Sequence, residues 1–397
     1  MNPGVLQTSQ QKCLLILGDG MADEPIAELG GRTVLEAAST PNMDYIARHG
    51  RMGMLQTIPS GFEPGSDIAN LSVLGYDPAR YYTGRGPLEA ASMGVVLAHD
   101  DIAYRCNLVT VQDGVMADFS AGHISSEEGR ELFASLQPAL AGTSLYSGIS
   151  YRNLLLLHHA RGAETTPPHD IVGKEIDSFL PEGEDKEILR HCMKVSAEVF
   201  ADHPVNRARA REGKSEATMI WPWSGGKTPS LPSFQEQFSR SGGMISGVDL
   251  LFGIARIAKM EVIRVPGATG YLDTNYREKI RYAVDAAARL DFVYVHVEAP
   301  DEAGHLGSIE EKIRAIERLD EAIGIALEEF DGMIVLLPDH PTPIRLKTHT
   351  RDPVPFAVLG LGRDETTQYS EREGERGSYG ILQGPELLPF LFSRTNE

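Results

Sequence analysis

The chain has 397 residues, of which 42% are apolar and 23% charged, which is ordinary for a globular protein and enough for more than one domain. A formal net charge of −19 argues against nucleic acid or an anionic membrane as a partner, because both are bound through clustered Lys and Arg. The three cysteines (Cys13, Cys106 and Cys192) are odd in number and far apart, so we expect no disulfide framework, no CxxC metal site and a cytoplasmic location. We also expect neither a signal peptide nor a transmembrane helix, since no apolar run approaches the ~20 residues of a membrane span.

The first predicted strand lies in residues 13–21, "CLLILGDGM". A continuous apolar run that ends in a polar loop is typical of a strand buried on both faces of a parallel sheet. Residues 40–50, "TPNMDYIARHG", then predict a helix with Pro41 at its first position and Gly50 after its last.

A single serine, Ser66, stands where the next helix is expected to begin, in "EPGSDIANLSVLGYDP" at residues 63–78. The ordinary interpretation is a helix N-cap, because a serine oxygen at this place accepts a hydrogen bond from a free backbone N–H. Taken alone, the segment favours this structural role over a chemical one.

Residues 95–230 differ in character from the segments on either side. They contain strand-like runs such as "IAYRCNLVTV" and "NLLLLHHA", several helical patterns, and a loop rich in Pro, Gly and Trp, "MIWPWSGGKTPSLPSF". We predict that this segment is a second domain, inserted into a core that is formed by residues 1–94 and 231–397.

The C-terminal third alternates strands and helices. Residues 292–305, "FVYVHVEAPDEAGH", predict a strand and an acidic loop, and residues 333–343, "MIVLLPDHPTP", predict a strand that ends in Asp-His. Between them, residues 308–330 carry the apolar stripe of an amphipathic helix. The alternation predicts an α/β fold with a mostly parallel sheet.

Acidic and histidine side chains follow three of these strands, at the edge where parallel sheets place their sites. The candidate metal ligands form two sets, which are Asp301, His305 and His349 in one and Asp19, Asp339 and His340 in the other. Carboxylate with imidazole suits Mn²⁺ or Zn²⁺ better than Ca²⁺, and Mg²⁺ is a further candidate. Two ions about 4 Å apart would clamp the entering and leaving oxygens of a phosphoryl transfer.

Each candidate also has an ordinary structural interpretation. Asp301 and His305 are four residues apart, as on a solvated helix face, Asp19 between glycines suits a turn, and His349 suits a loop. The metal interpretation is favoured because each pair, Asp301 with His305 and Asp339 with His340, comes directly after an apolar strand. A metal ion beside Ser66 would also activate its hydroxyl as a nucleophile, and a helix N-terminus there would bind a phosphate.

Nine segments in this order resemble a known family, and the resemblance as a whole runs from about residue 12 to 395. They are "LLILGDGMADEPI", "TPNMDYIARHG", "PGSDIANLSVLGYDP", "YYTGRGPLEAASMG", "DIAYRCNLVTV", "HPVNRARAREGK", "GATGYLDTNY", "EAPDEAGH" and "PDHPTP". The chain thereby resembles the archaeal-type cofactor-independent phosphoglycerate mutases of the alkaline-phosphatase-like metalloenzyme superfamily.

The resemblance implies an alkaline-phosphatase-like core, in which helices sandwich the sheet, with an inserted α/β cap that binds the substrate. It implies two divalent metal ions, preferably Mn²⁺, with Mg²⁺, Zn²⁺ and Co²⁺ also allowed. The first ion is expected on Asp301, His305 and His349, and the second on Asp19, Ser66, Asp339 and His340. The reaction would interconvert 3-phosphoglycerate and 2-phosphoglycerate through phosphorylated Ser66, with the closed cap excluding water.

The cap is expected to supply cations for the carboxylate and phosphate of the substrate, since the arginine fork suits both anions. The candidate substrate-binding residues of the cap are His123, Arg152, His169, Asp170, Arg207, Arg209 and Lys214, and Arg85 is expected to reach the phosphate from the core side. Each of the cationic positions would equally suit an ordinary surface side chain.

Rival functions are compatible with the same motifs. These motifs also resemble a bacterial subgroup proposed to act as homoserine kinases, whose caps would need an acidic partner for the substrate amine, such as Asp170 or Glu164. The chain has no GxxxxGK(S/T) phosphate loop, which counts against a conventional kinase. The same core would also suit a phosphomonoester hydrolase or a non-catalytic binding protein.

Overall fold

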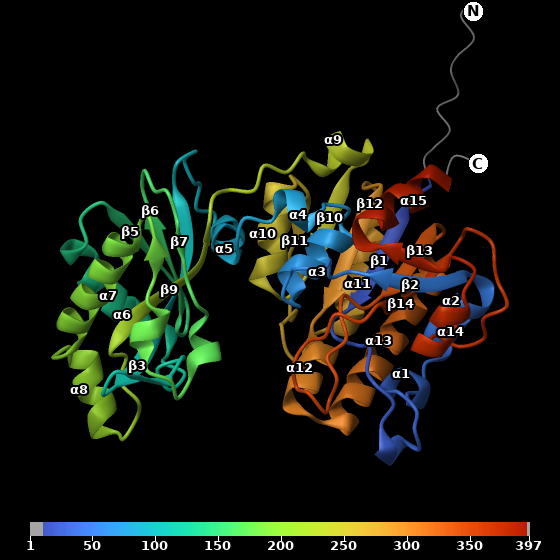
Figure 1. Ribbon diagram of the computed structural model, residues 1–397. Coiled ribbons are helices and arrows are strands. Elements are labelled where there is room, and N and C mark those ends of the chain that lie inside the picture. The colour runs from blue at the N-terminus through green and yellow to red at the C-terminus, as the bar shows by residue number, and fades with distance from the viewer. Residues whose placement is uncertain (1–10, 395–397) are drawn as a thin grey trace, which may run out of the picture. The chain divides into compact units, whose positions relative to one another are not determined.

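A computed structural model describes residues 11–394 of the chain. Tertiary contacts divide it into two compact units, one formed by the chain up to Tyr82 and from Leu231 onward, and the other by Thr83–Ser230. The first unit therefore holds two separate stretches of sequence, coloured blue and yellow to red in Figure 1, and the second holds the green stretch between them.

The first unit contains an eight-stranded, mostly parallel sheet within the described residues. In spatial order its strands are β11 (Glu261–Ile263), β10 (Gly242–Ile245), β12 (Phe292–Val297), β1 (Cys13–Gly18), β13 (Met333–Leu337), β14 (Val354–Leu359), β2 (Arg51–Gln56) and β15 (Ile381–Gln383). Strand β14 is antiparallel to both neighbours, and the expected α/β fold with a mostly parallel sheet is confirmed.

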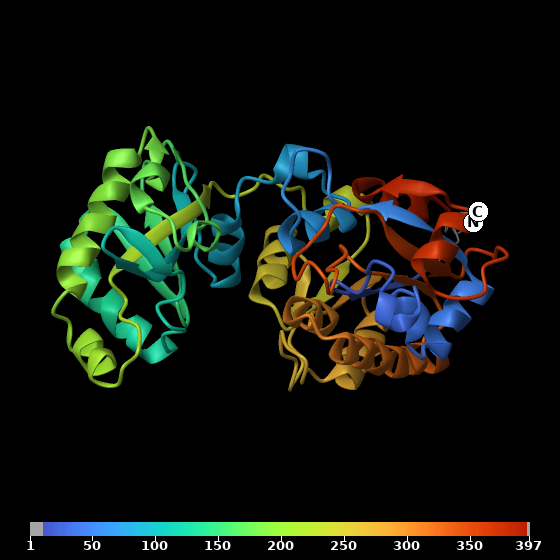
Figure 2. The same ribbon diagram turned by 60° about the horizontal axis from the view of Figure 1, so that its bottom comes forward.

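Helices cover both faces of this sheet (Figure 2). On one face α2 (Pro41–His49), α11 (Tyr276–Ala287) and α13 (Ile309–Glu329) share the largest apolar core with the strands. On the other face Phe234 of α9 (Phe234–Phe238) and Phe392 of α15 (Leu387–Arg394) stack around Phe292 of β12. The remaining α-helices of this unit within the described residues are α1 (Val34–Ala37), α3 (Ser66–Val73), α4 (Pro78–Tyr81), α10 (Asp249–Ile257), α12 (Ala299–Leu306) and α14 (Glu371–Arg376).

Strand β12 is buried on both of its faces, so helices must cover the sheet on both sides. Val293, Val295 and Val297 enter the core beneath α11 and α13, whereas Phe292 packs on the opposite face. Side chains alternate along a strand, so Tyr294 and His296 share the face of Phe292. All six residues of the strand are buried.

The second unit is built on antiparallel strands. β3 (Ile102–Gln112) lies between β6 (Arg152–Leu157) and the pair β4 (Val115–Asp118) and β9 (Met219–Gly226), and β5 (Thr143–Ile149) pairs with β6. Its α-helices and other strands within the described residues are α5 (Arg85–Ser92), α6 (Ser126–Leu136), α7 (Lys186–Phe200), α8 (Pro204–Arg211), β7 (Ala163–Glu164) and β8 (Glu182–Gly183).

The boundary of the second unit lies before α5, whereas the sequence suggested residue 95. Gly86 explains the difference, because a Cβ at this position would meet the carbonyl oxygen of Ala103 at 2.1 Å. Only glycine allows α5 to lie so close to β3, and α5 therefore belongs to the second unit.

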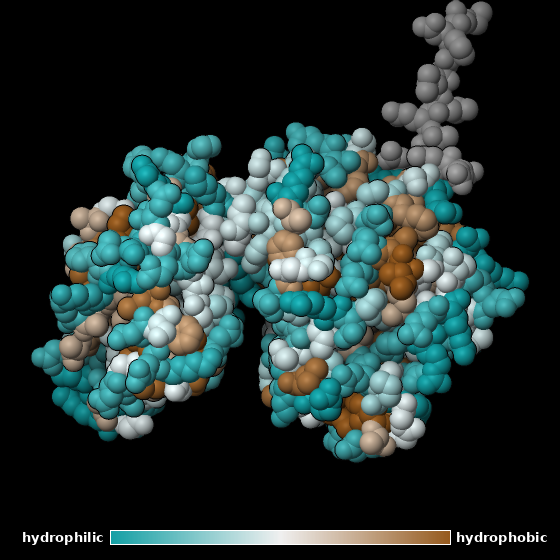
Figure 3. Space-filling view, viewed as in Figure 1, coloured by the Kyte–Doolittle hydropathy of each residue, from teal (hydrophilic) through white to brown (hydrophobic). Residues whose placement is uncertain are grey.

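The surface in view in Figure 3 is mostly hydrophilic, with apolar side chains in small scattered patches. None of the helices between residues 11 and 394 is both long and apolar enough to cross a membrane.

Candidate functional site

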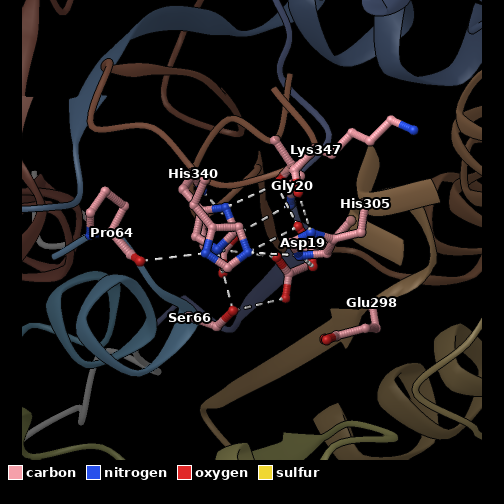
Figure 4. A network of polar contacts seen from close by, with 12 residues as sticks. Asp19, Gly20, Pro64, Ser66, Glu298, His305, His340 and Lys347 are labelled. Atoms are coloured by element: carbon pink, nitrogen blue, oxygen red, sulfur yellow. Dashed lines mark hydrogen bonds and ion pairs between the residues drawn. The ribbon is translucent and has the colours of Figure 1, made fainter. Parts of the chain in front are cut away.

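Three neighbouring strands of the first unit deliver acidic side chains to one edge of the sheet. Asp19 directly follows β1, Asp301 lies on the helix that follows β12, and Asp339 with His340 follows β13. Asp19, Asp339 and His340 are fully buried, and Asp301 is nearly so. Figure 4 shows Asp19, Ser66, His305 and His340 converging on one region.

Ser66 is the first helical residue of α3, and the preceding Gly65 is the N-cap. The N-cap interpretation of Ser66 is therefore wrong, since Gly65 holds that place. Ser66 Oγ lies 3.4 Å from Asp19 Oδ2 and 3.2 Å from His340 Nε2. The sequence placed this hydroxyl at the start of a helix correctly, and the fold turns it toward the acidic edge.

Helix α12 places Asp301 and His305 on one face, with His305 Nε2 3.1 Å from Asp301 Oδ2. His349 arrives from the loop after β13, and its Nε2 lies 3.0 Å from His305 Nε2 and 3.5 Å from Asp301 Oδ1. The Nδ1 atoms of the two histidines face backbone carbonyls, those of Lys347 at 2.9 Å and Pro64 at 3.4 Å. These contacts place a proton on each Nδ1. In a neutral ring the Nε2 lone pair is then available to a cation beside Asp301, and in a protonated ring Nε2 donates to the Asp301 carboxylate.

Burial and crowding shift the acid–base properties of this edge. Burial, followed by the nearby carboxylates of Asp339, Glu298 and Asp301, raises the pKa of Asp19 well above its usual value. Burial also raises the pKa of Asp301, but hydrogen bonds from His305 and His349 outweigh it and hold that pKa well below its usual value. The hydrogen bond to Asp301 raises the pKa of His305 to about 9.

The donor set fits a divalent cation. Asp19 Oδ1 is buried and accepts no hydrogen bond from the described residues, although His340 Nε2 lies 3.5 Å away. An unpartnered buried carboxylate oxygen among further carboxylates is costly without a positive charge. Carboxylate and imidazole ligands together are typical of Mn²⁺ and Zn²⁺ sites.

Three groups of residues bring one potential ligand atom each within 4.8 Å of one another. They are Asp301, His340 and His349; Asp19, His296 and Asp339; and Asp19, Glu298 and Asp301. The two sets expected from the sequence are thus joined in one continuous cluster, in which His340 also approaches the first set.

His296 and Glu298 were not among the residues predicted from the sequence, in which residues 292–305 indicated only a strand followed by an acidic loop. Burial lowers the pKa of His296 to about 4, and its Nε2 lies 2.9 Å from Asp19 Oδ2. Burial, then the charge of Asp301, raises the pKa of Glu298 to about 8. A histidine inside an otherwise apolar strand and a glutamate directly after it were the available signals.

The second unit holds a separate cluster of cationic and aromatic side chains. The guanidinium of Arg105 is almost fully buried, lies over the Trp223 ring at 4.4 Å, and pairs with Glu89 at 2.9 Å. Arg85 approaches the same carboxylate at 3.5 Å, so two guanidinium groups share one negative charge. His169 packs edge-on against Trp223 with ring centroids 5.3 Å apart, and burial lowers its pKa.

Other predicted substrate-binding residues lie around this cluster. Phe119 contacts both His169 and Tyr151, and Tyr151 in turn contacts His123 and lies beneath the guanidinium of Arg152. Arg105 was missed, although an arginine in the buried run "IAYRCNLVTV" was a visible signal.

Three predicted residues on or after α8 have other partners. Arg209 is buried, and its guanidinium donates to the carbonyls of Ser215 and Ala121 and pairs with Glu128. The exposed side chains of Arg207 and Lys214 form ion pairs with Asp202 and Glu212. Asp170 is exposed, and its carboxylate lies 3.7 Å from His169 Nε2.

Comparison with known proteins gives consistent results. The family model of 2,3-bisphosphoglycerate-independent phosphoglycerate mutase matches residues 47–206. A mutase of this name from Methanothrix thermoacetophila is 50% identical over 96% of this chain and 100% of its own length. A protein named as a probable mutase of the same kind from Geobacter sulfurreducens is 47% identical, again over 96% and 100%.

Two solved structures share the fold of this chain over nearly its whole length. A Pyrococcus horikoshii protein superposes with a TM-score of 0.85 at 32% identity and covers 98% of both chains. A cofactor-independent phosphoglycerate mutase from Thermoplasma acidophilum has a TM-score of 0.67 at 28% identity, covering 96% of this chain and 99% of its own.

Proposed function

The chain belongs to the 2,3-bisphosphoglycerate-independent phosphoglycerate mutases, and we propose that it interconverts 3-phosphoglycerate and 2-phosphoglycerate through phosphorylated Ser66. The observation that carries the chemistry is the position of Ser66 Oγ, within 3.4 Å of both Asp19 and His340. The homoserine-type phosphotransferase is not favoured, because relatives that are about half identical are named as mutases.

Divalent ions would be held by seven side chains of the first unit, which are Asp19, Ser66, Asp301, His305, Asp339, His340 and His349. We propose two ions, with Mn²⁺ preferred because the set mixes carboxylates with imidazoles. Bound ions would neutralise phosphate charge and favour the deprotonated form of the serine hydroxyl.

Ser66 carries the phosphoryl group between the two positions of glycerate. As its Oγ forms a bond to phosphorus, it loses its proton, and the P–O bond to the 3-oxygen of the substrate breaks while that oxygen takes up a proton. The 2-hydroxyl of the same glycerate then attacks the phosphoserine, loses its proton and restores the serine hydroxyl. The N-terminus of α3 stabilises the negative charge near Ser66, since the positive end of the helix dipole lies there.

We propose that the second unit binds the substrate through its cationic and aromatic cluster. Arg85, Arg105 and Arg152 would bind carboxylate and phosphate oxygens, while His123, His169 and Asp170 would bind hydroxyl groups. Contact of Arg207 and Lys214 with substrate stays a prediction from the sequence. For Arg209 we propose an indirect role, because its guanidinium is bound to protein acceptors.

The net charge and the cysteines indicate which partners and which cellular compartment we propose for the protein. The partner is a small phosphorylated molecule, and the strongly negative net charge fits neither a nucleic acid nor a membrane surface as a second partner. Three unpaired, buried cysteines suit the reducing cytoplasm.

The decisive experiment is an assay with Mn²⁺ and 3-phosphoglycerate, without added bisphosphoglycerate, in which enolase reports the 2-phosphoglycerate formed. Ser66→Ala is expected to abolish turnover. Ser72→Ala is the matched control on the same helix, since the Ser72 hydroxyl is buried and has no hydrogen-bond partner in the described part of the chain.

Turnover that is lost only in Ser66→Ala would support both the mutase and the serine route. Absence of turnover in wild-type protein that holds Mn²⁺ would refute the mutase. Homoserine with a phosphoryl donor would then be the next substrate to test.

A further inference from the structure

Two fully buried polar residues of β12, Tyr294 and His296, reach toward the acidic edge without being among its expected ligands. We propose that they are positioning residues, which hold the carboxylates of Asp339 and Asp19 in the orientation that metal binding requires. This inference rests on the proposed function, because it assumes that these carboxylates bind metal.

His296 is fixed by a directional chain of hydrogen bonds. The backbone N–H of Val248 donates to Ser246 Oγ at 2.9 Å, so the Ser246 hydroxyl is free to donate its own hydrogen to His296 Nδ1, 3.3 Å away. This contact leaves the proton of the neutral ring on Nε2, which donates to Asp19 Oδ2 at 2.9 Å. His296 therefore occupies Oδ2 of Asp19, whereas Oδ1 accepts no hydrogen bond from the described residues and lies 3.5 Å from His340 Nε2.

Tyr294 acts through Asn70, which lies one turn after Ser66 on α3. The Tyr294 hydroxyl donates to Asn70 Oδ1 at 2.5 Å, and Asn70 Nδ2 donates to Asp339 Oδ2 and to the Ser66 carbonyl, each at 2.8 Å. All three hydrogen-bonding groups of the Asn70 amide are used. The reverse orientation would turn the amide oxygen toward a carboxylate, so the contacts fix which way the amide points.

These two chains of hydrogen bonds leave little rotational freedom to the carboxylates of Asp19 and Asp339. Asp339 accepts from Asn70 on Oδ2 and from the backbone N–H groups of Gly20 and His340 on Oδ1, at 3.2 and 2.9 Å. Asn70 also ties Asp339 to the turn that carries Ser66, so one amide sets the position of a ligand and of the nucleophile. All these donors are neutral, so they orient the carboxylates without adding a positive charge that would compete with a cation.

Removing hydrogen-bond partners of metal ligands typically costs 10–100-fold in metal affinity. The first test compares His296→Asn with His296→Gln. The glutamine amide reaches the place of Nε2 and can still donate to Asp19, whereas the asparagine amide reaches only the place of Nδ1. Mn²⁺ affinity of metal-free protein, measured from the EPR signal of free Mn²⁺, is expected to fall about 10–100-fold in His296→Asn and much less in His296→Gln.

Tyr294→Phe provides the second test, with Tyr369→Phe as its control. Tyr369 is also fully buried in the first unit, and its hydroxyl donates to the Pro355 carbonyl at 2.9 Å, away from the acidic edge. Both variants lose one buried hydroxyl, so similar losses in the Tm of metal-free protein are expected. Only Tyr294→Phe is expected to weaken Mn²⁺ binding.

The outcomes separate the inference from the proposed function. Wild-type affinity for Mn²⁺ in both His296→Asn and Tyr294→Phe would overturn the positioning role and leave the metal site intact. Equal loss of affinity in His296→Asn and His296→Gln would overturn the role assigned to the Nε2 donor. Failure of wild-type protein to bind Mn²⁺ would instead overturn the proposed metal site.

Discussion

His305 and His349 bring their Nε2 atoms to 3.0 Å from each other, with both Nδ1 atoms directed at backbone carbonyls. Two imidazole lone pairs this close, beside the buried carboxylate of Asp301, need a cation between them. In the metal-free protein a proton serves this purpose, which agrees with the raised pKa of His305.

Metal should therefore stabilise the folded chain measurably. At a Mn²⁺ concentration 100 times its Kd, binding to the native state alone adds about 2.7 kcal/mol. We expect the Tm to rise by roughly 5–10 °C for a unit of this size, and to rise much less in His349→Ala. His49→Ala, at an exposed position on α2, should retain the full increase. An equal increase in all three proteins would argue against His349 as a ligand.

Lys312 joins two loops of the acidic edge, the loop that follows β1 and the loop that follows β13. Its fully buried Nζ donates to Asp23 Oδ2 at 2.8 Å and to the carbonyls of Ala22 and Thr342 at 3.1 and 2.8 Å. Lys312→Met would leave the buried Asp23 carboxylate without its counter-charge, so we expect a loss of about 3–5 kcal/mol in the free energy of unfolding by urea. Lys186→Met, which breaks an exposed pair, should cost less than about 0.5 kcal/mol.

Arg105 tests the proposed substrate cluster. Its guanidinium stacks on Trp223 while pairing with Glu89, which a lysine cannot do because it lacks the planar fork. We expect Arg105→Lys to lower kcat/KM for 3-phosphoglycerate at least ~10-fold, chiefly by raising KM. Arg161→Met, at an exposed ion pair of the same unit, should leave kcat/KM unchanged. Unchanged kinetics in Arg105→Lys would remove Arg105 from the proposed binding site.

The sequence predicted the acidic edge well because its signals were local. Asp19, Asp301 and Asp339 each follow a continuous apolar run, and a parallel sheet brings the carboxyl ends of such strands together. The spacing of Asp301 and His305 was also sufficient, since α12 places them on one face. These predictions needed only the pattern of apolar residues, the helical spacing of Asp301 and His305, and the rule that parallel sheets place their sites at the carboxyl ends of the strands.

Other features depend on partners that are distant in the sequence. Ser66 has the local pattern of an N-cap, and the partners of its hydroxyl, Asp19 and His340, are far away in the sequence. Arg209 resembles a surface arginine of a basic helix. In the structure it is buried, and its guanidinium donates hydrogen bonds to the carbonyls of Ala121 and Ser215. Neither relationship has a signature in the neighbouring residues, so the sequence could not reveal it.

The loop that carries His123 gives the last prediction. Ala121, Gly122 and His123 all have positive φ angles, of 49°, 65° and 49°, which is costly for the two residues that have side chains. Arg209 holds this conformation through the Ala121 carbonyl, and Asp118 Oδ2 holds it through the N–H of Gly122.

Arg209→Met should release the loop that carries His123, because the carbonyls of Ala121 and Ser215 would lose the guanidinium that donates to them. We expect a loss of roughly 2–4 kcal/mol in the free energy of unfolding and a higher KM for 3-phosphoglycerate, since His123 would no longer be preorganised. Arg211→Met is the matched control on α8, at an exposed position two residues further along. A stability loss with an unchanged KM would mean that Arg209 supports only the fold, and that His123 does not contribute to substrate binding.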